Sequence, residues 1–325
     1  MPKLYYIEAI TQALQEEMAR DSSVFCIGED IAEYGGAFKV TKGLVERFGV
    51  DRVIDSPLDE AAIIGVSIGA AIMGMRPVAE MQFADFVACG FNQLVNNAAK
   101  IYYRWGHPVP MVVRCPSGGG LSAGPYHSQN PEAWFIHTPG LKVVAPYSAY
   151  DAKGLLKAAI RDPNPVVFLE HKYLYRRMKE EVPEEEYIVP LGKAKIQRLG
   201  KDLSVITYGS MVVFALEAAE KLQKETGYQA EIVDLRTLVP LDEELVLASV
   251  KKTSKALLLH EASLNCGFGA EVAARIAEKV FTFLDGPVKR LASKDTPVPF
   301  SPALEENFMP TVDKIYQSML DLARF

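Results

Sequence analysis

The 325-residue sequence lacks the short motifs that identify many metal-binding and nucleotide-binding proteins. Its four cysteines, Cys26, Cys89, Cys115 and Cys266, are far apart and form no CxxC pair, so we expect neither a zinc site nor a disulfide framework. No GxGxxG follows a predicted strand, and there is no Walker A, HExxH or GxSxG sequence. These absences leave a nicotinamide cofactor unsupported and indicate the reduced thiols of a cytoplasmic protein.

Long apolar runs and an excess of positive charge are also missing. The longest apolar run, 61–75, has about fifteen residues where a membrane span needs ~20, so we predict a buried helix there. The N-terminal residues contain no apolar core of the signal-peptide type and have the pattern of an amphipathic helix. The net charge of −6 disfavours a broad surface for nucleic acid or anionic membrane. We therefore expect no nucleic acid and no membrane among the partners.

The sequence does contain a regular alternation of β-rich and helical patterns. Such an alternation predicts an α/β fold in which helices cover both faces of a parallel sheet, giving three α/β/α layers. Ser148 has the pattern of a helix N-cap, and Gly227 that of a helix end. The predicted strands are 23–30, 76–83, 109–115, 141–147, 165–172, 203–209, 229–235, 255–261 and 287–292, and the main predicted helices are 91–105, 148–162, 211–227, 241–253 and 267–281.

The alternation is interrupted once, by the charged and proline-marked stretch 176–199. This composition is typical of a domain linker. We predict two domains, 1–180 and 196–325, joined by a linker at 181–195.

Glu60 is the residue whose setting most needs an explanation, because it opens the apolar, glycine-containing run "EAAIIGVSIGAAIMG". On the residue pattern alone, a first-turn acid favoured by the helix dipole is the stronger interpretation. The loop 116–130, "PSGGGLSAGPYHSQN", is either flexible or able to cradle an anion, and His127 within it has the pattern of a surface residue. The remaining histidines have no metal-ligand spacing and are expected to be structural: His107, His137, His171 and His260.

Several stretches, in order along almost the whole chain, resemble the β subunit of the E1 component of 2-oxo acid dehydrogenase complexes, which use thiamine diphosphate. They are "IGEDIAEYGGAFKVTKGL", "RVIDSPLDEAAIIG", "AEMQFADF", "YHSQNPEAWF", "PGLKVVAPYSAYDAKGLLKAAIRDPNPVVFLEHK", "EIVDLRTLVPLD" and "DTPVPFSPALEENFMPTVDKI". The resemblance implies a pyrimidine-binding domain of transketolase type, then a transketolase C-terminal-type domain.

The resemblance also implies an α2β2 enzyme in which the α subunit holds the diphosphate and its magnesium through a GDG-type motif. This chain has no GDG, and its nearest string is "GED" at 28–30. The chain is therefore expected to bind only the aminopyrimidine end of thiamine diphosphate.

Four residues are implied to contact the aminopyrimidine: Leu58, Glu60, Gln82 and Phe86. Glu60 would hydrogen-bond N1′ and promote the imine form of the 4′-amino group, which removes the C2 proton of the thiazolium. Phe86 would lie against the ring, Leu58 would line the pocket, and Gln82 would bond near the cofactor or an ordered water. On pattern alone, core packing for Phe86 and a loop cap for Gln82 are the ordinary interpretations.

The resemblance places His127 at the mouth of the active site, as a proton or hydrogen-bond donor to the substrate or to the incoming lipoyl group. It also matches 159–164 to a loop that binds a structural potassium ion in some members. A helix end with turn residues is an equally favoured interpretation of that stretch. The implied potassium residues are Met111, Ala159, Ile160, Asp162 and Asn164.

The implied function is oxidative decarboxylation of a small 2-oxo acid, with transfer of the acyl group to the lipoyl group of the E2 acyltransferase. The substrate is left open between pyruvate, a branched-chain 2-oxo acid and acetoin. The small residues Ala61, Gly65 and Gly69 would let another helix approach closely, and the resemblance implies that this helix lies near a subunit interface, with local core packing as the alternative. An alternative of another class is a non-catalytic subunit that only assembles partners.

Overall fold

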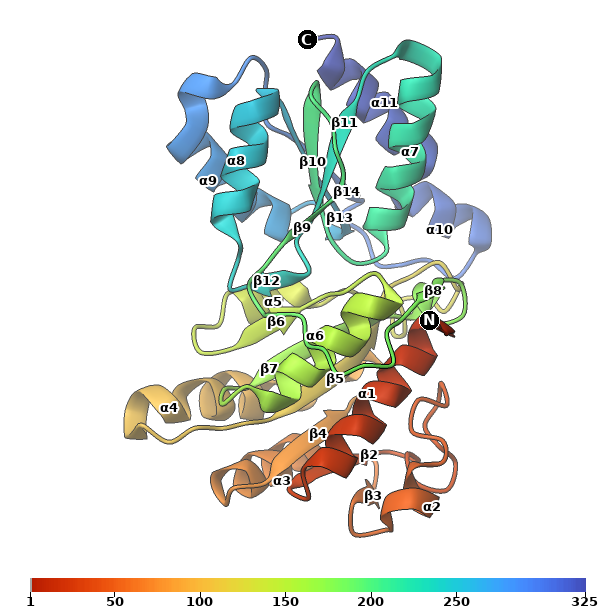
Figure 1. The fold of residues 1–325 in the computed structure, drawn as a ribbon, viewed down its shortest axis with the longest axis vertical. Helices are drawn as coiled ribbons and strands as arrows, with labels where there is room; N and C mark the ends of the chain where they lie inside the picture. The colour runs from red at the N-terminus through yellow and green to blue at the C-terminus, as the bar shows by residue number, and fades with distance from the viewer. Residues whose placement is uncertain (1) are drawn as a thin grey trace. The chain divides into compact units, whose positions relative to one another are not determined.

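The computed structural model describes residues 2–325, which form two compact units (Figure 1). The first contains residues up to Ser117 and Trp134–Leu191, and the second contains Gly118–Ala133 and Gly192–Phe325. The glycine-rich segment Gly118–Ala133 therefore packs with the second unit, although the chain enters and leaves it from the first. Each unit is described on its own.

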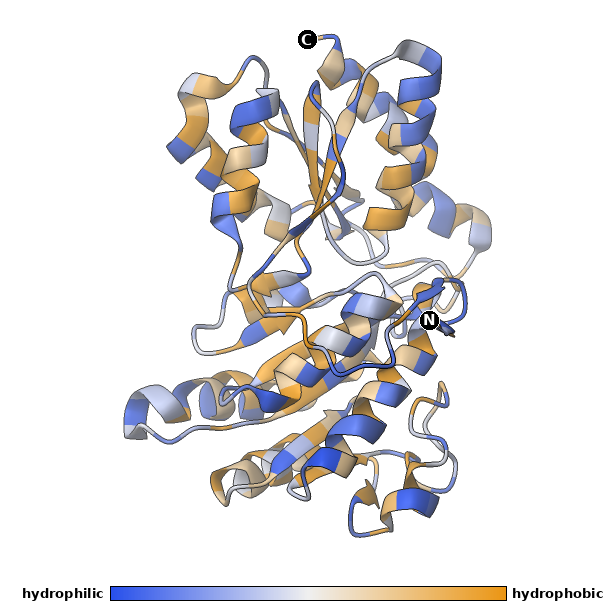
Figure 2. Cartoon of the chain, viewed as in Figure 1, coloured by the Kyte–Doolittle hydropathy of each residue, from blue (hydrophilic) through white to orange (hydrophobic). Residues whose placement is uncertain are grey.

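The first unit is built on a sheet in which the strand order β6-β7-β5-β4-β2-β3 is parallel throughout. Its central strands are buried along their whole length, as expected when both faces of a parallel sheet are covered. Figure 2 shows the apolar colour of these strands. Their bounds are β2 Val24–Gly28, β3 Val53–Asp55, β4 Arg76–Glu80, β5 Val112–Ser117, β6 Lys142–Val144 and β7 Val166–His171.

Two long helices of the first unit, α1 (Tyr6–Arg20) and α6 (Ala149–Arg161), lie side by side (Figure 1). The predicted N-cap is confirmed, because the Ser148 side chain accepts a hydrogen bond from the backbone N–H of Asp151 at 3.1 Å. Within the predicted helix 91–105, the segment η2 (Gln93–Ala98) is π-helical. Other elements of this unit are β1 Lys3–Tyr5, α2 Leu44–Phe48, α3 Glu60–Ile72, η1 Ala84–Ala88, η2 Gln93–Ala98, α4 Ala99–Trp105, η3 Lys172–Leu174 and β8 Lys179–Glu181, while α5 is Glu132–Ile136.

The apolar run 61–75 forms α3, but the prediction that this helix is buried was wrong for one of its faces. Val66 is 57% exposed and Met73 is 83% exposed. A Cβ added to Gly69 would meet no atom within 4 Å. The helix therefore presents an apolar, small-residue face that none of residues 2–325 covers. In the part of the chain that the structure describes, no helix is long and apolar enough to span a membrane.

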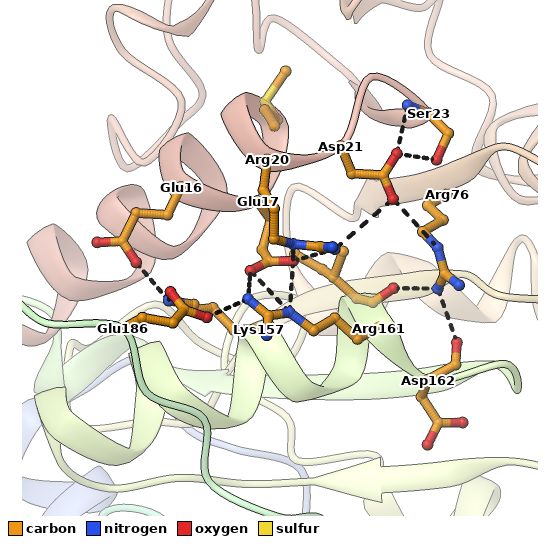
Figure 3. A network of polar contacts seen from close by, with 12 residues as sticks. Glu16, Glu17, Arg20, Asp21, Ser23, Arg76, Lys157, Arg161, Asp162 and Glu186 are labelled. Atoms are coloured by element: carbon orange, nitrogen blue, oxygen red, sulfur yellow. Dashed lines mark hydrogen bonds and ion pairs between the residues drawn. The ribbon is translucent and has the colours of Figure 1, made fainter.

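The end of the first unit, 182–191, packs against α6, and its Val182 also shares a buried apolar cluster with Ala9 of α1. Glu186 pairs with Lys157 and Arg161 at 2.5 Å each, and Arg161 also bonds the fully buried Glu17 (Figure 3). Tyr187 stacks on Tyr150 with ring centroids 4.5 Å apart. This stretch, predicted as linker, therefore has ionic and aromatic attachments that its composition did not reveal.

The second unit is built on a sheet of strand order β14-β13-β10-β11-β9, parallel except for the antiparallel edge strand β9. Helices α7 and α11 lie side by side (Figure 1), and α7 ends at Gly227 with φ +83°, as predicted. The bounds are β9 Lys195–Arg198, β10 Leu203–Thr207, α7 Met211–Thr226, β11 Ala230–Asp234, β12 Thr237–Val239, α8 Glu243–Thr253, β13 Ala256–Ser263, α9 Phe268–Val280, η4 Phe281–Phe283, β14 Lys289–Ser293, α10 Pro302–Phe308 and α11 Val312–Ala323.

Candidate cofactor-binding edge and glycine-rich loop

The candidate cofactor residues of the first unit follow the carboxyl ends of three adjacent parallel strands. Strand β2 lies between β3 and β4, so the loops after these strands meet at one edge of the sheet. Glu29 directly follows β2, Glu60 lies five positions after the end of β3, and Gln82 and Phe86 follow β4. Ligands of open α/β sheets bind at this edge.

Two acidic side chains share this edge. Glu29 is 4% exposed, and its Oε1 is buried without a hydrogen-bond partner among residues 2–325. Burial raises the pKa of Glu29, and the negative charge of Glu60 raises that pKa further. Glu60 is half-buried as the first residue of α3, where the Asp59 side chain accepts from the Ala62 N–H at 3.0 Å. A polar ligand that donates hydrogen bonds at this point would stabilise the two carboxyl groups.

The sequence analysis did not select Glu29. The only signal available for it was its place in "IGED", because nothing local indicates that a residue following a strand lies beside Glu60 thirty-one positions later. Parallel pairing of β2 and β3 brings the two together.

An aromatic cluster positions Phe86. Its ring meets that of Phe83 edge to face at 5.6 Å, and Phe83 meets Phe38 in the same manner at 5.4 Å. The same segment packs against the start of α3, since a Cβ added to Gly90 would lie 3.0 Å from the carbonyl oxygen of Glu60. The structure thus brings Phe86 and Glu60 to the same edge.

Leu58 and Gln82 are also at this edge, with different surroundings. Leu58 is 82% exposed on the loop between β3 and α3, whereas Gln82 is half-buried after β4. An apolar side chain so exposed within its own unit is available to a ligand or to another chain.

A buried ionic group fixes the strand ends beneath these loops. Arg114 on β5 is 1% exposed, contacts Glu80 at the end of β4, and donates two hydrogen bonds of 2.6 and 2.7 Å to Glu170 on β7. The Tyr175 hydroxyl donates to Glu170 at 2.7 Å. Glu80 lies two positions before Gln82. The contact between Arg114 and Glu80 therefore fixes the point where the loop of Gln82 and Phe86 begins.

His127 belongs to the second unit, so no single unit brings it together with Glu60. It is half-buried, and its backbone N–H donates to the carbonyl oxygen of Gly124 at 3.4 Å. His260, expected to be structural, is buried on β13, and burial lowers its pKa to about 4.

The predicted potassium residues lie at the opposite, amino edge of the first sheet, because Asp162 and Asn164 precede β7. The carbonyl oxygen of Ile160 accepts from Arg76 at 2.7 Å, and the Asp162 carboxylate contacts Lys142. The Asn164 N–H donates to Asp162 Oδ1 at 2.9 Å. Met111 and Ala159 are buried there. Within residues 2–325, no group of three His, Cys, Asp or Glu side chains is arranged to hold a metal ion.

Comparison with known proteins shows which domain family each half of the chain matches. Residues 3–178 match the family "Transketolase, pyrimidine binding domain", and residues 192–315 match "Transketolase, C-terminal domain". The chain is 52% identical to the 2-oxoisovalerate dehydrogenase subunit beta of Bacillus subtilis, over 100% of both chains. It belongs to the 2-oxo acid dehydrogenase E1 β-subunit family.

Two other E1 β subunits are similar to this chain. It is 45% identical to the mitochondrial pyruvate dehydrogenase E1 component subunit beta-2 of Oryza sativa, over 96% of this chain and 84% of that one. It is equally identical to the pyruvate dehydrogenase E1 component subunit beta of Staphylococcus epidermidis, over 93% and 94%. These relatives confirm the E1 β resemblance and do not favour the acetoin alternative.

The solved structure titled "Split gene transketolase, inactive beta4 tetramer" has the same fold. Its TM-score is 0.80 over 99% of this chain and 98% of that chain, at 23% identity. The prediction of two transketolase-type α/β domains is confirmed.

Proposed function

We propose that this E1 β chain works with an α subunit as a thiamine diphosphate-dependent 2-oxo acid dehydrogenase. The observation that carries the proposal is the pair Glu29 and Glu60 at the carboxyl edge of a pyrimidine-binding domain. The buried Oε1 of Glu29, without a partner in residues 2–325, fits a site completed by a polar ligand. Thiamine diphosphate, when bound, supplies a carbon nucleophile and an electron sink for decarboxylation.

Glu60 holds the hydrogen bond to N1′ of the aminopyrimidine and thereby controls where the proton of that ring resides. Its partly apolar setting strengthens this bond, because a hydrogen bond is electrostatically stronger at low dielectric. Glu29 places a second acidic group beside it. Phe86 and Leu58 supply apolar contact, and Gln82 a polar contact, around the same ring.

His127 serves the second half of the reaction in this proposal. It donates a proton at the sulfur of the lipoyl group when the dithiolane opens, because histidine is the side chain that most often serves as a general acid. The acyl group then leaves on the lipoyl group of the E2 acyltransferase.

A branched-chain 2-oxo acid is the substrate we propose, with pyruvate second. The support is the higher identity to the 2-oxoisovalerate relative, 52%, than to the pyruvate relatives, 45%. The substrate preference is tested by assembling this chain with the α subunit from the same source and measuring turnover of each 2-oxo acid. Faster turnover of pyruvate than of 2-oxoisovalerate would reverse the order.

The α subunit is proposed to hold the diphosphate and magnesium, since this chain has no GDG motif. The uncovered face of α3, with Val66 and Gly69, is proposed as a subunit interface of an α2β2 assembly. Titration of the purified chain with cofactor and magnesium, with and without α, tests whether the diphosphate and magnesium site belongs to the α subunit. Tight magnesium-dependent binding by this chain alone would contradict it.

A potassium ion in the loop after α6 is part of the proposal. The carbonyl oxygens of Ala159 and Ile160 lie at a helix C-terminus, where the dipole favours cations, and each carbonyl has a second lone pair beyond its hydrogen bond. A higher melting temperature in potassium chloride than in choline chloride, lost in Asp162→Ala, is the expected result. Equal melting temperatures in the two salts would remove the ion from the proposal.

A further inference from the structure

The loop that carries His127 is tied at its base by one carboxylate of its own unit. Glu261, at the carboxyl end of the sheet on β13, accepts from the Gly119 N–H at 2.7 Å and from the Asn130 side chain at 2.8 Å, both at Oε1. Its Oε2 accepts from the Ser210 hydroxyl at 2.8 Å. Glu261 therefore joins the beginning and the end of the loop and anchors both to the sheet.

A second carboxylate, from helix α10, holds residues 120–122, which form the leg of the loop. Glu305 is 4% exposed, and its Oε1 accepts from the Gly120 N–H at 2.8 Å. Its Oε2 accepts from the Ser122 N–H at 2.9 Å and lies 3.3 Å from the Ser122 hydroxyl. Both oxygens of one buried carboxylate are used on backbone amides, and such charge-assisted bonds are about twice as strong as neutral ones.

Glu305 can approach the backbone of the loop this closely because position 119 is a glycine. A Cβ added to Gly119 would lie 3.1 Å from Glu305 Oε1. At the tip of the loop, Gly124 has φ +74°, and a Cβ there would lie 2.4 Å from the ring of Phe300. Phe300 lies five positions before Glu305, so one C-terminal segment supports both the leg and the tip.

We propose that Glu305 is the positioning residue for His127, which it does not touch. The backbone N–H of His127 bonds Gly124, so the histidine is part of the turn that the leg and tip define. Loss of the two hydrogen bonds from the backbone amides to Glu305 would allow the leg of the loop to move. A displacement of a catalytic group by about 1 Å can cost on the order of 10²-fold in rate. This inference rests on the role of His127 proposed above.

The first test measures the loop itself, independently of any reaction. Hydrogen exchange across 118–130 is compared in the assembled enzyme for wild type, Glu305→Gln, Glu305→Ala and the matched control Glu306→Ala. Glu306 is the exposed neighbour of Glu305. We expect faster exchange at Gly120 and Ser122 in the order Ala, then Gln, then wild type, because glutamine keeps one acceptor oxygen. Unchanged exchange in Glu305→Ala would overturn the proposal.

The second test asks whether Glu305 acts through His127. Glu305→Ala is expected to slow acyl transfer to a lipoyl domain by tenfold or more while decarboxylation with an artificial electron acceptor falls less, and Glu305→Gln to lie between Ala and wild type. In the His127→Ala background, Glu305→Ala should cost little further, since groups acting as a unit are non-additive. Full additivity would refute the positioning role. If His127→Ala itself leaves acyl transfer unchanged while the exchange result holds, the proposed role of His127 fails and the anchoring by Glu305 stands.

Discussion

The hydroxyl of Tyr208 donates a hydrogen bond of 2.6 Å to Oε1 of Glu132, a carboxyl group that is only 1% exposed. Glu132 lies at the end of the glycine-rich loop, and Tyr208 directly follows β10 in the same unit. Burial raises the pKa of Glu132 to about 7, while the bond from Tyr208 opposes that rise. The carboxyl is thus held neutral at mildly acidic pH.

The raised pKa predicts a pH dependence of stability with a definite sign. Below about pH 4.5 the carboxyl is protonated in both folded and unfolded chains, and between 4.5 and 7 only the folded chain keeps its proton. Stability should therefore fall as the pH rises through this window, by roughly 3 kcal/mol at most. Glu132→Gln cannot ionise, so its melting temperature should exceed that of wild type by more at pH 8 than at pH 5. The same difference at both pH values would show that Glu132 is not held neutral.

Glu60→Gln should leave the fold intact and sharply slow proton loss at C2 of bound thiamine diphosphate. The reason is that an amide cannot shift the proton equilibrium at N1′ as a carboxyl group does. Hydrogen–deuterium exchange at C2 in the assembled enzyme is the measurement, with Asp59→Asn as the control because the neighbouring Asp59 caps α3. A wild-type exchange rate in Glu60→Gln would rule out the assignment and favour a non-catalytic assembly subunit.

His127→Ala should separate the two half-reactions. Decarboxylation needs no proton from this side chain, whereas opening the dithiolane leaves a sulfur anion that an acid can protonate. General acid catalysis is worth ~10²–10⁴-fold, so the overall rate should fall by about that factor, and decarboxylation with an artificial acceptor much less. Equal losses in both assays at saturating cofactor would mean that His127 only orders its loop.

Gly154→Ala should destabilise the first unit. Its added Cβ would lie 2.5 Å from Val189 Cγ2 and 2.8 Å from Tyr187 Cε2, so the strap 182–191 would have to move. Overpacking of this kind costs about 1–3 kcal/mol, against a helix-propensity gain of up to about 1 kcal/mol. Gly69→Ala in α3, where an added Cβ would have no neighbour within 4 Å, is the matched control, and its unfolding midpoint in the isolated chain should stay the same or rise through the same propensity gain. Equal midpoints for the two variants would argue against tight docking of the strap.

Much of the fold was predictable from local patterns. The cap at Ser148, the helix end at Gly227 and the buried strands depend on neighbours a few positions away, and the structure confirms them. The exposed face of α3 was not predictable, because hydropathy records how apolar a helix is but not how many of its faces have a partner.

The candidate site divides in the same way. The sequence by itself determined the family and pointed to Glu60, Phe86 and His127, because their motifs are contiguous in the chain. Only the tertiary structure decided that Glu29 lies beside Glu60, that Gly118–Ala133 packs with the second unit, and that Glu305 holds its backbone from 183 positions away. The physical reason is that these relationships depend on strand pairing and on carboxylates meeting backbone amides, which carry no side-chain signature of their own.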